Sequence, residues 1–165
     1  VALDNIISIK EEIKEIAYEI KDVNNAFFLG RGTDYYVALE ASLKLKEITY
    51  IHSEAFPGGE LKHGPLALVE KNTPIFGFIT LPEISASAAM RGNFSEVKAR
   101  NAKVYSFVTK NLASKDDTII IDNLNRDISA LAIVMVAQYL AYYTALARNN
   151  DIDKPRNLAK SVTVE

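Results

Sequence analysis

Residues 26–36 read AFFLGRGTDYY, and this stretch decides the fold. Its first four residues form a short, unbroken apolar run, which is typical of a strand buried on both faces of a parallel sheet. Residues 30–33 make a glycine-rich turn, and a helix is predicted to begin at Asp34. A strand that runs through a tight turn into a helix begins a βα unit, so this stretch predicts an α/β protein.

The same alternation continues along the rest of the chain, with short connections. Strands are predicted at residues 26–29, 51–56, 74–80, 103–108 and 118–121. Helices are predicted at residues 3–22, 34–50, 85–101 and 128–147. The pattern indicates a three-layer α/β sandwich around a mostly parallel sheet. We expect residues 1–150 to form this domain and residues 151–165 to be a polar tail, with Pro155 stopping the preceding helix.

Composition excludes several classes of function. A length of 165 residues, with 48% hydrophobic and 24% charged residues, is typical of one globular domain. The net charge of -2 without a basic block makes nucleic acid an unexpected partner. The sequence has no cysteine, which rules out disulfides and a thiol nucleophile and suits a cytoplasmic protein.

One segment, residues 128–147, is uncharged and about long enough to cross a bilayer. It contains Gln138 and three tyrosines, and no second segment resembles it. A buried helix or a subunit-interface helix is therefore favoured over a membrane span.

The helix predicted at 34–50 carries two stripes. An apolar stripe is expected to face the sheet and consists of Val37, Ala38, Ala41, Leu45 and Ile48. Beside it Glu40, Lys44 and Glu47 follow one another at helical spacing, so Lys44 lies between two carboxylates. Spacing alone is typical of a solvated ion-pair ladder.

The turn before this helix could bind phosphate through free backbone N–H groups. Asp34 places a negative charge at the same positive helix end, which favours a turn with its cap instead.

Residues 59–65 read GELKHGP and place His63 between glycine and proline. An accessible histidine can carry protons, although a lone histidine is more often structural. His52 lies in a predicted strand, and the two histidines do not form a metal-ligand set, so no metal site is expected. Lys160, in the tail, could form a Schiff base with a carbonyl substrate if it were held in place.

Four motifs together resemble the end of the glucosamine-6-phosphate synthase family, the isomerising glutamine:fructose-6-phosphate aminotransferases. They are GRG at 30–32, EASLKLKE at 40–47, YIHSEAFPGGELKHGPLALVE at 50–70 and DKPRNLAKSVTVE at 153–165. The resemblance covers essentially the whole chain, including its ending. It implies the sugar isomerase (SIS) fold, as the second of two SIS subdomains, and the non-methionine first residue leads us to expect a fragment.

The resemblance also implies roles for single residues. Glu47 matches the base that moves a proton between C1 and C2 of the sugar, and Lys44 matches a lysine that assists at the substrate hydroxyls. His63 matches the histidine that opens the sugar ring from the neighbouring subunit. Lys160 matches the lysine that forms a Schiff base with open-chain fructose 6-phosphate, and Ala159 is expected to line the sugar.

The chain also departs from the complete family pattern. It has no cysteine to hydrolyse glutamine and no S-x-S-G-x-T phosphate loop, since residues 81–83 read LPE. We therefore expect a C-terminal isomerase half that forms no glucosamine 6-phosphate alone. Its expected partners are the first SIS subdomain, the glutaminase domain and a second copy in a homodimer, with no cofactor.

Two alternatives remain open. One is a related phosphosugar isomerase or deglycase without a glutaminase domain, against which the tail sequence NLAKSVTVE argues. The other is a non-catalytic SIS module that binds a sugar phosphate to regulate a partner. Such a module would not need the four residues Lys44, Glu47, His63 and Lys160 together.

Overall fold

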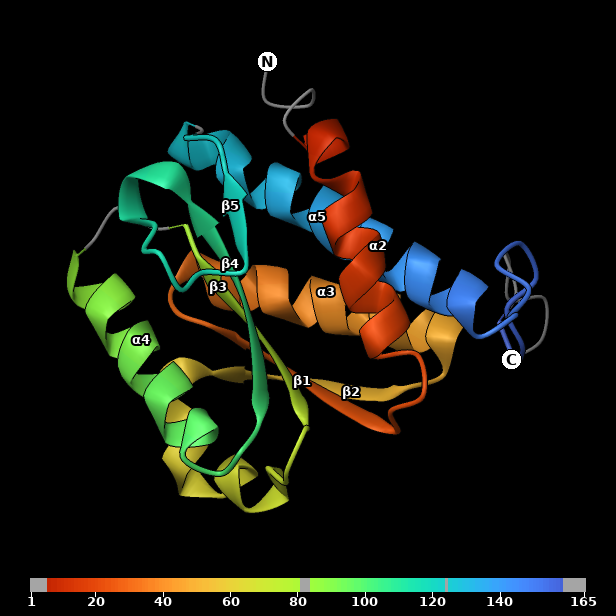
Figure 1. Ribbon diagram of the computed structural model, residues 1–165, viewed down its shortest axis with the longest axis horizontal. Helices are drawn as coiled ribbons and strands as arrows, with labels where there is room; N and C mark the ends of the chain where they lie inside the picture. Colours follow the sequence, from red (N-terminus) through yellow and green to blue (C-terminus); the bar gives the residue numbers. More distant parts are fainter. Residues whose placement is uncertain (1–5, 81–83, 124, 159–165) are drawn as a thin grey trace, which may run out of the picture.

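The sheet is parallel throughout the part of the chain that the structure describes. The computed structural model describes residues 6–80, 84–123 and 125–158, and within them five strands form one sheet in the order β2-β1-β3-β4-β5 (Figure 1). The strands are β1 (Asn25–Gly30), β2 (His52–Pro57), β3 (Pro74–Ile79), β4 (Lys103–Thr109) and β5 (Ile119–Ile121). Every neighbouring pair is parallel, which confirms the α/β prediction.

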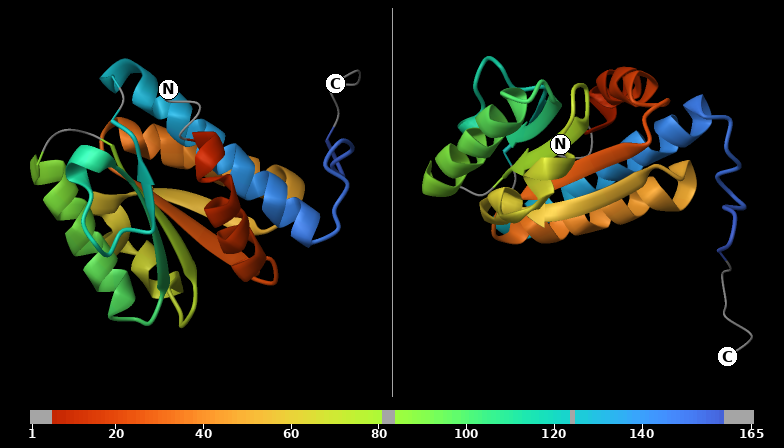
Figure 2. Two further views of the ribbon diagram at one scale, coloured as in Figure 1. Left: turned by 45° about the horizontal axis from the view of Figure 1, so that its top comes forward. Right: turned by 90° about the horizontal axis from the view of Figure 1, so that it is seen from below.

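Helices cover both faces of this sheet and make the outer two layers. On one face α3 (Thr33–Thr49) and α5 (Arg126–Ala147) lie side by side with α2 (Lys10–Glu19) packed on α5. On the other face lies α4 (Ile84–Lys98), next to the short 3-10 helix η1 (Gly58–His63). Figure 2 shows α3 and α5 on the opposite side of the sheet from α4. Two further 3-10 turns are η2 (Pro65–Leu68) and η3 (Lys110–Leu112).

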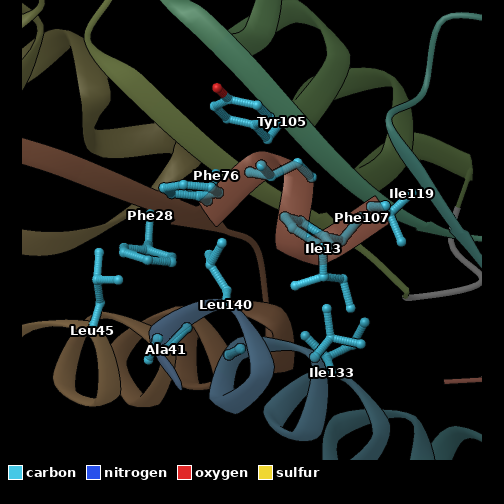
Figure 3. Packing of buried hydrophobic residues seen from close by; sticks show 14 of the residues in the cluster. Ile13, Phe28, Ala41, Leu45, Phe76, Tyr105, Phe107, Ile119, Ile133 and Leu140 are labelled. Atoms are coloured by element: carbon cyan, nitrogen blue, oxygen red, sulfur yellow. The ribbon is translucent and has the colours of Figure 1, made fainter. Parts of the chain in front are cut away.

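The alternation of side chains along the buried strands divides the core in two. Phe28, Phe76 and Phe107 point toward the α3 and α5 layer, where Leu45 and Leu140 meet them (Figure 3). The Phe28 and Phe76 rings stack with centroids 4.8 Å apart. The alternate residues of the same strands point toward α4 and include Leu29, Ile75 and Val108. Strands apolar on both sides are what a sheet with two helical layers requires.

The apolar stripe predicted on α3 faces this core. Val37, Ala38, Ala41 and Leu45 are buried, and Ile48 is partly buried against the same cluster. The charged stripe with Lys44 lies at the edge of this buried face, and its three members are only partly exposed.

Two local predictions need correction. Pro155 does not stop α5, because the helix ends at Ala147 and Asn149 follows in the left-handed conformation with φ 58°. Asparagine tolerates this conformation, and it breaks the helix before the proline is reached. The sequence pattern also predicts a Gly/Pro-rich loop at residues 57–59, whereas β2 runs to Pro57 and η1 begins at Gly58.

The stretch Ala130–Ala147 of α5 is, among the described residues, the one helical segment long and apolar enough to cross a membrane by those two criteria. Half of this stretch is buried within the domain. Core helices of globular proteins commonly have this composition.

Candidate functional site

The polar stripe of α3 forms a tight cluster of charges at the domain surface. Lys44 Nζ lies 2.9 Å from Glu47 Oε2 and 3.6 Å from Glu40 Oε1. The three side chains are between 28% and 41% exposed, so all of them remain reachable by a ligand. Helical spacing predicted these contacts, and the structure adds that all three side chains are partly exposed.

Glu47 stabilises the protonated form of Lys44. The hydrogen bond that Lys44 donates to Glu47 raises the pKa of Lys44 above its usual value of 10.5, and this effect outweighs the lowering caused by burial. Lys44 is therefore an ammonium at neutral pH, and it can donate hydrogen bonds but cannot attack a carbonyl. The carboxylate of Glu47, 2.9 Å away, is the group of this pair that can accept a proton.

His63 lies on the other side of the molecule from this pair. It is the last residue of η1, its side chain is exposed, and it is followed by Gly64 with φ 138°. Leu61 of the same 3-10 helix packs into the core layer beneath α4. Within one chain the structure therefore does not bring His63 next to Glu47, which lies on the α3 face.

The other two predicted site residues, Ala159 and Lys160, lie outside the described residues. The part of the tail that is described contacts the C-terminal end of α3, where the main-chain N–H of Arg156 donates a hydrogen bond of 2.9 Å to the Tyr50 hydroxyl. Sequence analysis did not select Tyr50, because no local pattern links it to a residue 106 positions later.

The N-terminal end of α3 is built differently. Gly30 permits the tight turn, since a Cβ there would lie 2.3 Å from the main chain of Asp34. Asp34 is 4% exposed, and its carboxylate accepts hydrogen bonds from the Thr80 main-chain N–H, at 2.9 Å, and from the Thr80 hydroxyl. Gly32 is the N-cap residue of α3 and Asp34 lies in its first turn, where its carboxylate fastens α3 to the end of β3.

This end of α3 lies at the switch point of the sheet, where β1 is followed on one side by β2 and on the other by β3. Open parallel sheets commonly bind ligands in the crevice at such a point. Here the cavity between Arg31, Asp34 and Met90 measures about 10 Å³, and Arg31 is held by Asn93 Oδ1 at 3.1 Å. Among the described residues, side chains leave little room in this crevice.

No metal centre is visible within residues 6–80, 84–123 and 125–158, where no three histidine, aspartate or glutamate side chains are grouped to hold an ion.

The fold and the sequence define the class of this protein. The SIS domain family matches residues 19–148, and the chain belongs to this family.

Within that class, relatives of high sequence identity carry the name of an isomerising aminotransferase. The chain is 51% identical over 165 residues to a glutamine--fructose-6-phosphate aminotransferase [isomerizing] of Listeria monocytogenes, covering 99% of the chain and 27% of that relative. It is 48% identical over 165 residues to the protein of the same name in Bacillus subtilis, with the same coverage. The solved C-terminal domain of glucosamine-fructose-6-phosphate aminotransferase from Francisella tularensis superposes with a TM-score of 0.82 at 37% identity, covering 93% of the chain and 44% of that structure. The chain thus spans about 27% of the length of the curated relatives it matches.

Proposed function

We propose that this chain is the C-terminal isomerase half of an isomerising glutamine:fructose-6-phosphate aminotransferase, acting in the conversion of fructose 6-phosphate to glucosamine 6-phosphate. The observation that carries the proposal is the Lys44–Glu47 pair, 2.9 Å apart on a surface stripe of α3, in a chain about half identical to enzymes of that name. In this proposal residues 1–150 are the second SIS subdomain and residues 151–165 are a catalytic tail.

The chemistry begins at Lys160. Its neutral amine attacks the C2 carbonyl of open-chain fructose 6-phosphate, and loss of water gives an imine. Ammonia released from glutamine by the glutaminase domain then adds to the imine carbon, and the Lys160 amine leaves. The sugar retains an imine at C2, now carrying the nitrogen of the product.

Glu47 then moves the proton. The imine makes the C1 hydrogens acidic, so the carboxylate removes one of them, and the C–H electron pair becomes a C1–C2 double bond while the C2–N double bond opens to nitrogen. Return of the proton from Glu47 to C2, with transfer of the O1 proton to the nitrogen, gives the C1 aldehyde and the C2 amine of glucosamine 6-phosphate. Lys44 remains an ammonium throughout, and in this proposal it holds Glu47 in place and donates to the sugar hydroxyls.

The remaining residues act around this centre. His63 opens the sugar ring, and because η1 lies on the face opposite α3, we propose that it serves the site of a second copy in a homodimer. Ala159 lines the sugar, and the first SIS subdomain of the complete enzyme holds the phosphate, since the described side chains leave little room in the switch-point crevice. A cytoplasmic location belongs to the same proposal.

The test is chemical trapping in the complete enzyme. Borohydride reduction with fructose 6-phosphate should leave a covalent adduct at Lys160, and Lys160→Arg should abolish both the adduct and turnover, a loss on the order of 1000-fold or more. Arginine keeps the charge but cannot form the imine at neutral pH. Lys154→Arg, in the same tail, is the matched control and should retain activity. Near-normal turnover of Lys160→Arg would exclude the Schiff base.

A further inference from the structure

The first residues after α5 are attached to the C-terminal end of α3. The side-chain amide of Asn150 donates hydrogen bonds to the carbonyl oxygens of Ile48, at 2.9 Å, and Thr49, at 3.3 Å. The last carbonyls of a helix have no partner within the helix, so an amide placed there satisfies them. The start of the tail is therefore held at the end of α3.

A second attachment lies six residues further along the tail. The main-chain N–H of Arg156 donates to the Tyr50 hydroxyl at 2.9 Å, and the Arg156 guanidinium lies 4.0 Å from the centroid of the Tyr50 ring. A cation over the face of an aromatic ring is attracted by the ring's electron density. Tyr50 thus holds the tail by a hydrogen bond to the main chain and by a stack on the side chain.

Tyr50 occupies a backbone position that does not favour it. Its φ is 63° and its ψ is 14°, the left-handed conformation in which helices usually end on glycine. A bulky residue there is strained, and such strain persists only where surrounding contacts maintain it. Glycine would adopt this conformation without strain. The contacts that the tyrosine side chain makes with Arg156 are therefore a reason for tyrosine at this position.

The attachment limits where Lys160 can reach. Lys160 follows Arg156 by four residues, and four extended residues span at most about 14 Å. Glu47 precedes Tyr50 by three residues, which is about 5 Å along a helix axis. What the attachment fixes is the start of this span, because it holds Arg156 at the end of α3 that carries Glu47.

We propose that Tyr50 and Arg156 are positioning residues that clamp the tail so that the Lys160 amine is presented to the same substrate as Glu47. The inference rests on the proposed Schiff-base function. Tyr50 and Arg156 act through Lys160 and do not themselves touch the reacting atoms.

The clamp itself can be tested in the isolated chain, independently of any activity. The sequence has no cysteine, so Leu158→Cys, at an exposed position two residues after Arg156, accepts a single spin label. With the native clamp the label should show restricted motion, and Tyr50→Gly should make it several-fold more mobile. Glycine suits the left-handed position, so the melting temperature should stay within a few degrees. Tyr18→Phe, at an exposed tyrosine of α2, is the control.

The second measurement is made on the complete enzyme. Tyr50→Phe removes only the hydrogen bond and should lower kcat and the rate of borohydride-trapped adduct about threefold to tenfold, with KM for fructose 6-phosphate little changed. Tyr50→Gly and Arg156→Ala should lower both rates about tenfold to 100-fold, and Arg156→Lys should recover part of the loss because it keeps the cation. A fall in both kcat and the adduct rate, with KM and the melting temperature little changed, indicates misplacement of Lys160 and not a loss of folded protein.

The outcomes distinguish failure of the clamp from failure of the proposed Schiff base at Lys160. If Lys160→Arg abolishes turnover while Tyr50→Gly leaves kcat and the adduct rate intact, the Schiff base is supported and the clamp is overturned. If Lys160→Arg retains turnover, the Schiff base fails and the clamp loses its catalytic purpose. Unrestricted motion of the Leu158→Cys label with the native Tyr50 present would overturn the clamp on its own.

Discussion

The two ends of α3 differ in what their polar groups do. At the N-terminal end Asp34 is buried and accepts hydrogen bonds from Thr80, and the described side chains leave little room beside it. In the C-terminal half Lys44 and Glu47 are about a third exposed. The end where open parallel sheets commonly bind ligands is a structural anchor here, and the accessible charges lie on the stripe beside the buried face of the helix.

The two ends of α3 differ because burying a charged group costs free energy, whereas leaving it partly exposed does not. A buried carboxylate is tolerated only when hydrogen bonds replace its water, and the amide and hydroxyl of Thr80 do so for Asp34. A partly exposed ion pair such as Lys44–Glu47 contributes at most about 1 kcal/mol to stability. Folding therefore depends on the first group and hardly on the second, which leaves the second available for chemistry.

Among the substitutions that test this difference between the two ends of α3, we expect the largest loss of activity at Glu47. In the complete enzyme Glu47→Gln should lower kcat by about 100-fold to 10,000-fold, since it removes a general base. Glu40→Gln is the matched control, because Glu40 lies on the other side of Lys44 at 3.6 Å, and it should retain turnover within about threefold. Both variants should unfold within about 0.5 kcal/mol of the native protein in urea. Equal losses of activity in the two variants would show that the stripe acts only through its net charge.

The position of His63 on the opposite face predicts complementation between subunits. Glu47→Gln and His63→Gln enzymes should each be nearly inactive, whereas a mixed dimer contains one site in which both residues are native. Random mixing should restore about a quarter of native activity, because half of the dimers are mixed and each has one working site. Activity assays after denaturation and refolding of an equal mixture provide the measurement. Failure to recover activity would place His63 in the site of its own chain, or outside the site.

The anchor at the other end of α3 should matter for stability. Asp34→Ala leaves the Thr80 main-chain N–H buried without its acceptor and should lower the free energy of unfolding of the isolated chain by about 2–4 kcal/mol. Asp116→Ala, at an exposed aspartate, should change it by less than about 0.5 kcal/mol. Urea denaturation followed by circular dichroism compares them. A loss below about 0.5 kcal/mol for Asp34→Ala would mean that the anchor carries no weight in folding.

The smallest effect concerns a buried ion pair away from both ends of α3. The Asp117 side chain is 2% exposed and accepts hydrogen bonds from Arg91 at 3.0 and 2.8 Å. Burial raises the pKa of Asp117, but hydrogen bonds from Arg91, the Ser114 amide and the Ser106 hydroxyl outweigh it and leave the pKa below its usual 3.8.

A lowered carboxyl pKa stabilises the fold above the usual value, and this stabilisation is lost as the pH falls through the folded-state value. Asp117→Asn should therefore cost about 1–2 kcal/mol at pH 7, and the difference from the native chain should shrink toward pH 3. Urea denaturation at several pH values measures it. A difference that stays constant from pH 7 to pH 3 would contradict the assignment.

Much of the fold could be predicted from local pattern. The apolar run at 26–29 and the 3.6-residue spacing on α3 identified the parallel sheet and placed Lys44 between Glu40 and Glu47. These features depend on the geometry of a strand or a helix, which is the same wherever the element lies. The failure at Pro155 was also local, since Asn149 ended α5 earlier through a left-handed conformation that asparagine only sometimes adopts.

By itself, the sequence determined the class of fold, the order of its elements and the charged stripe that we propose for catalysis. Only the tertiary structure decided which distant groups meet: Asp34 with Thr80, 46 residues apart, and Tyr50 with Arg156, 106 residues apart. It also decided that His63 lies on the face opposite Glu47. Such pairings follow from strand order, register and the crossing of α5 over α3, and these arise from packing the whole chain, so no local spacing encodes them.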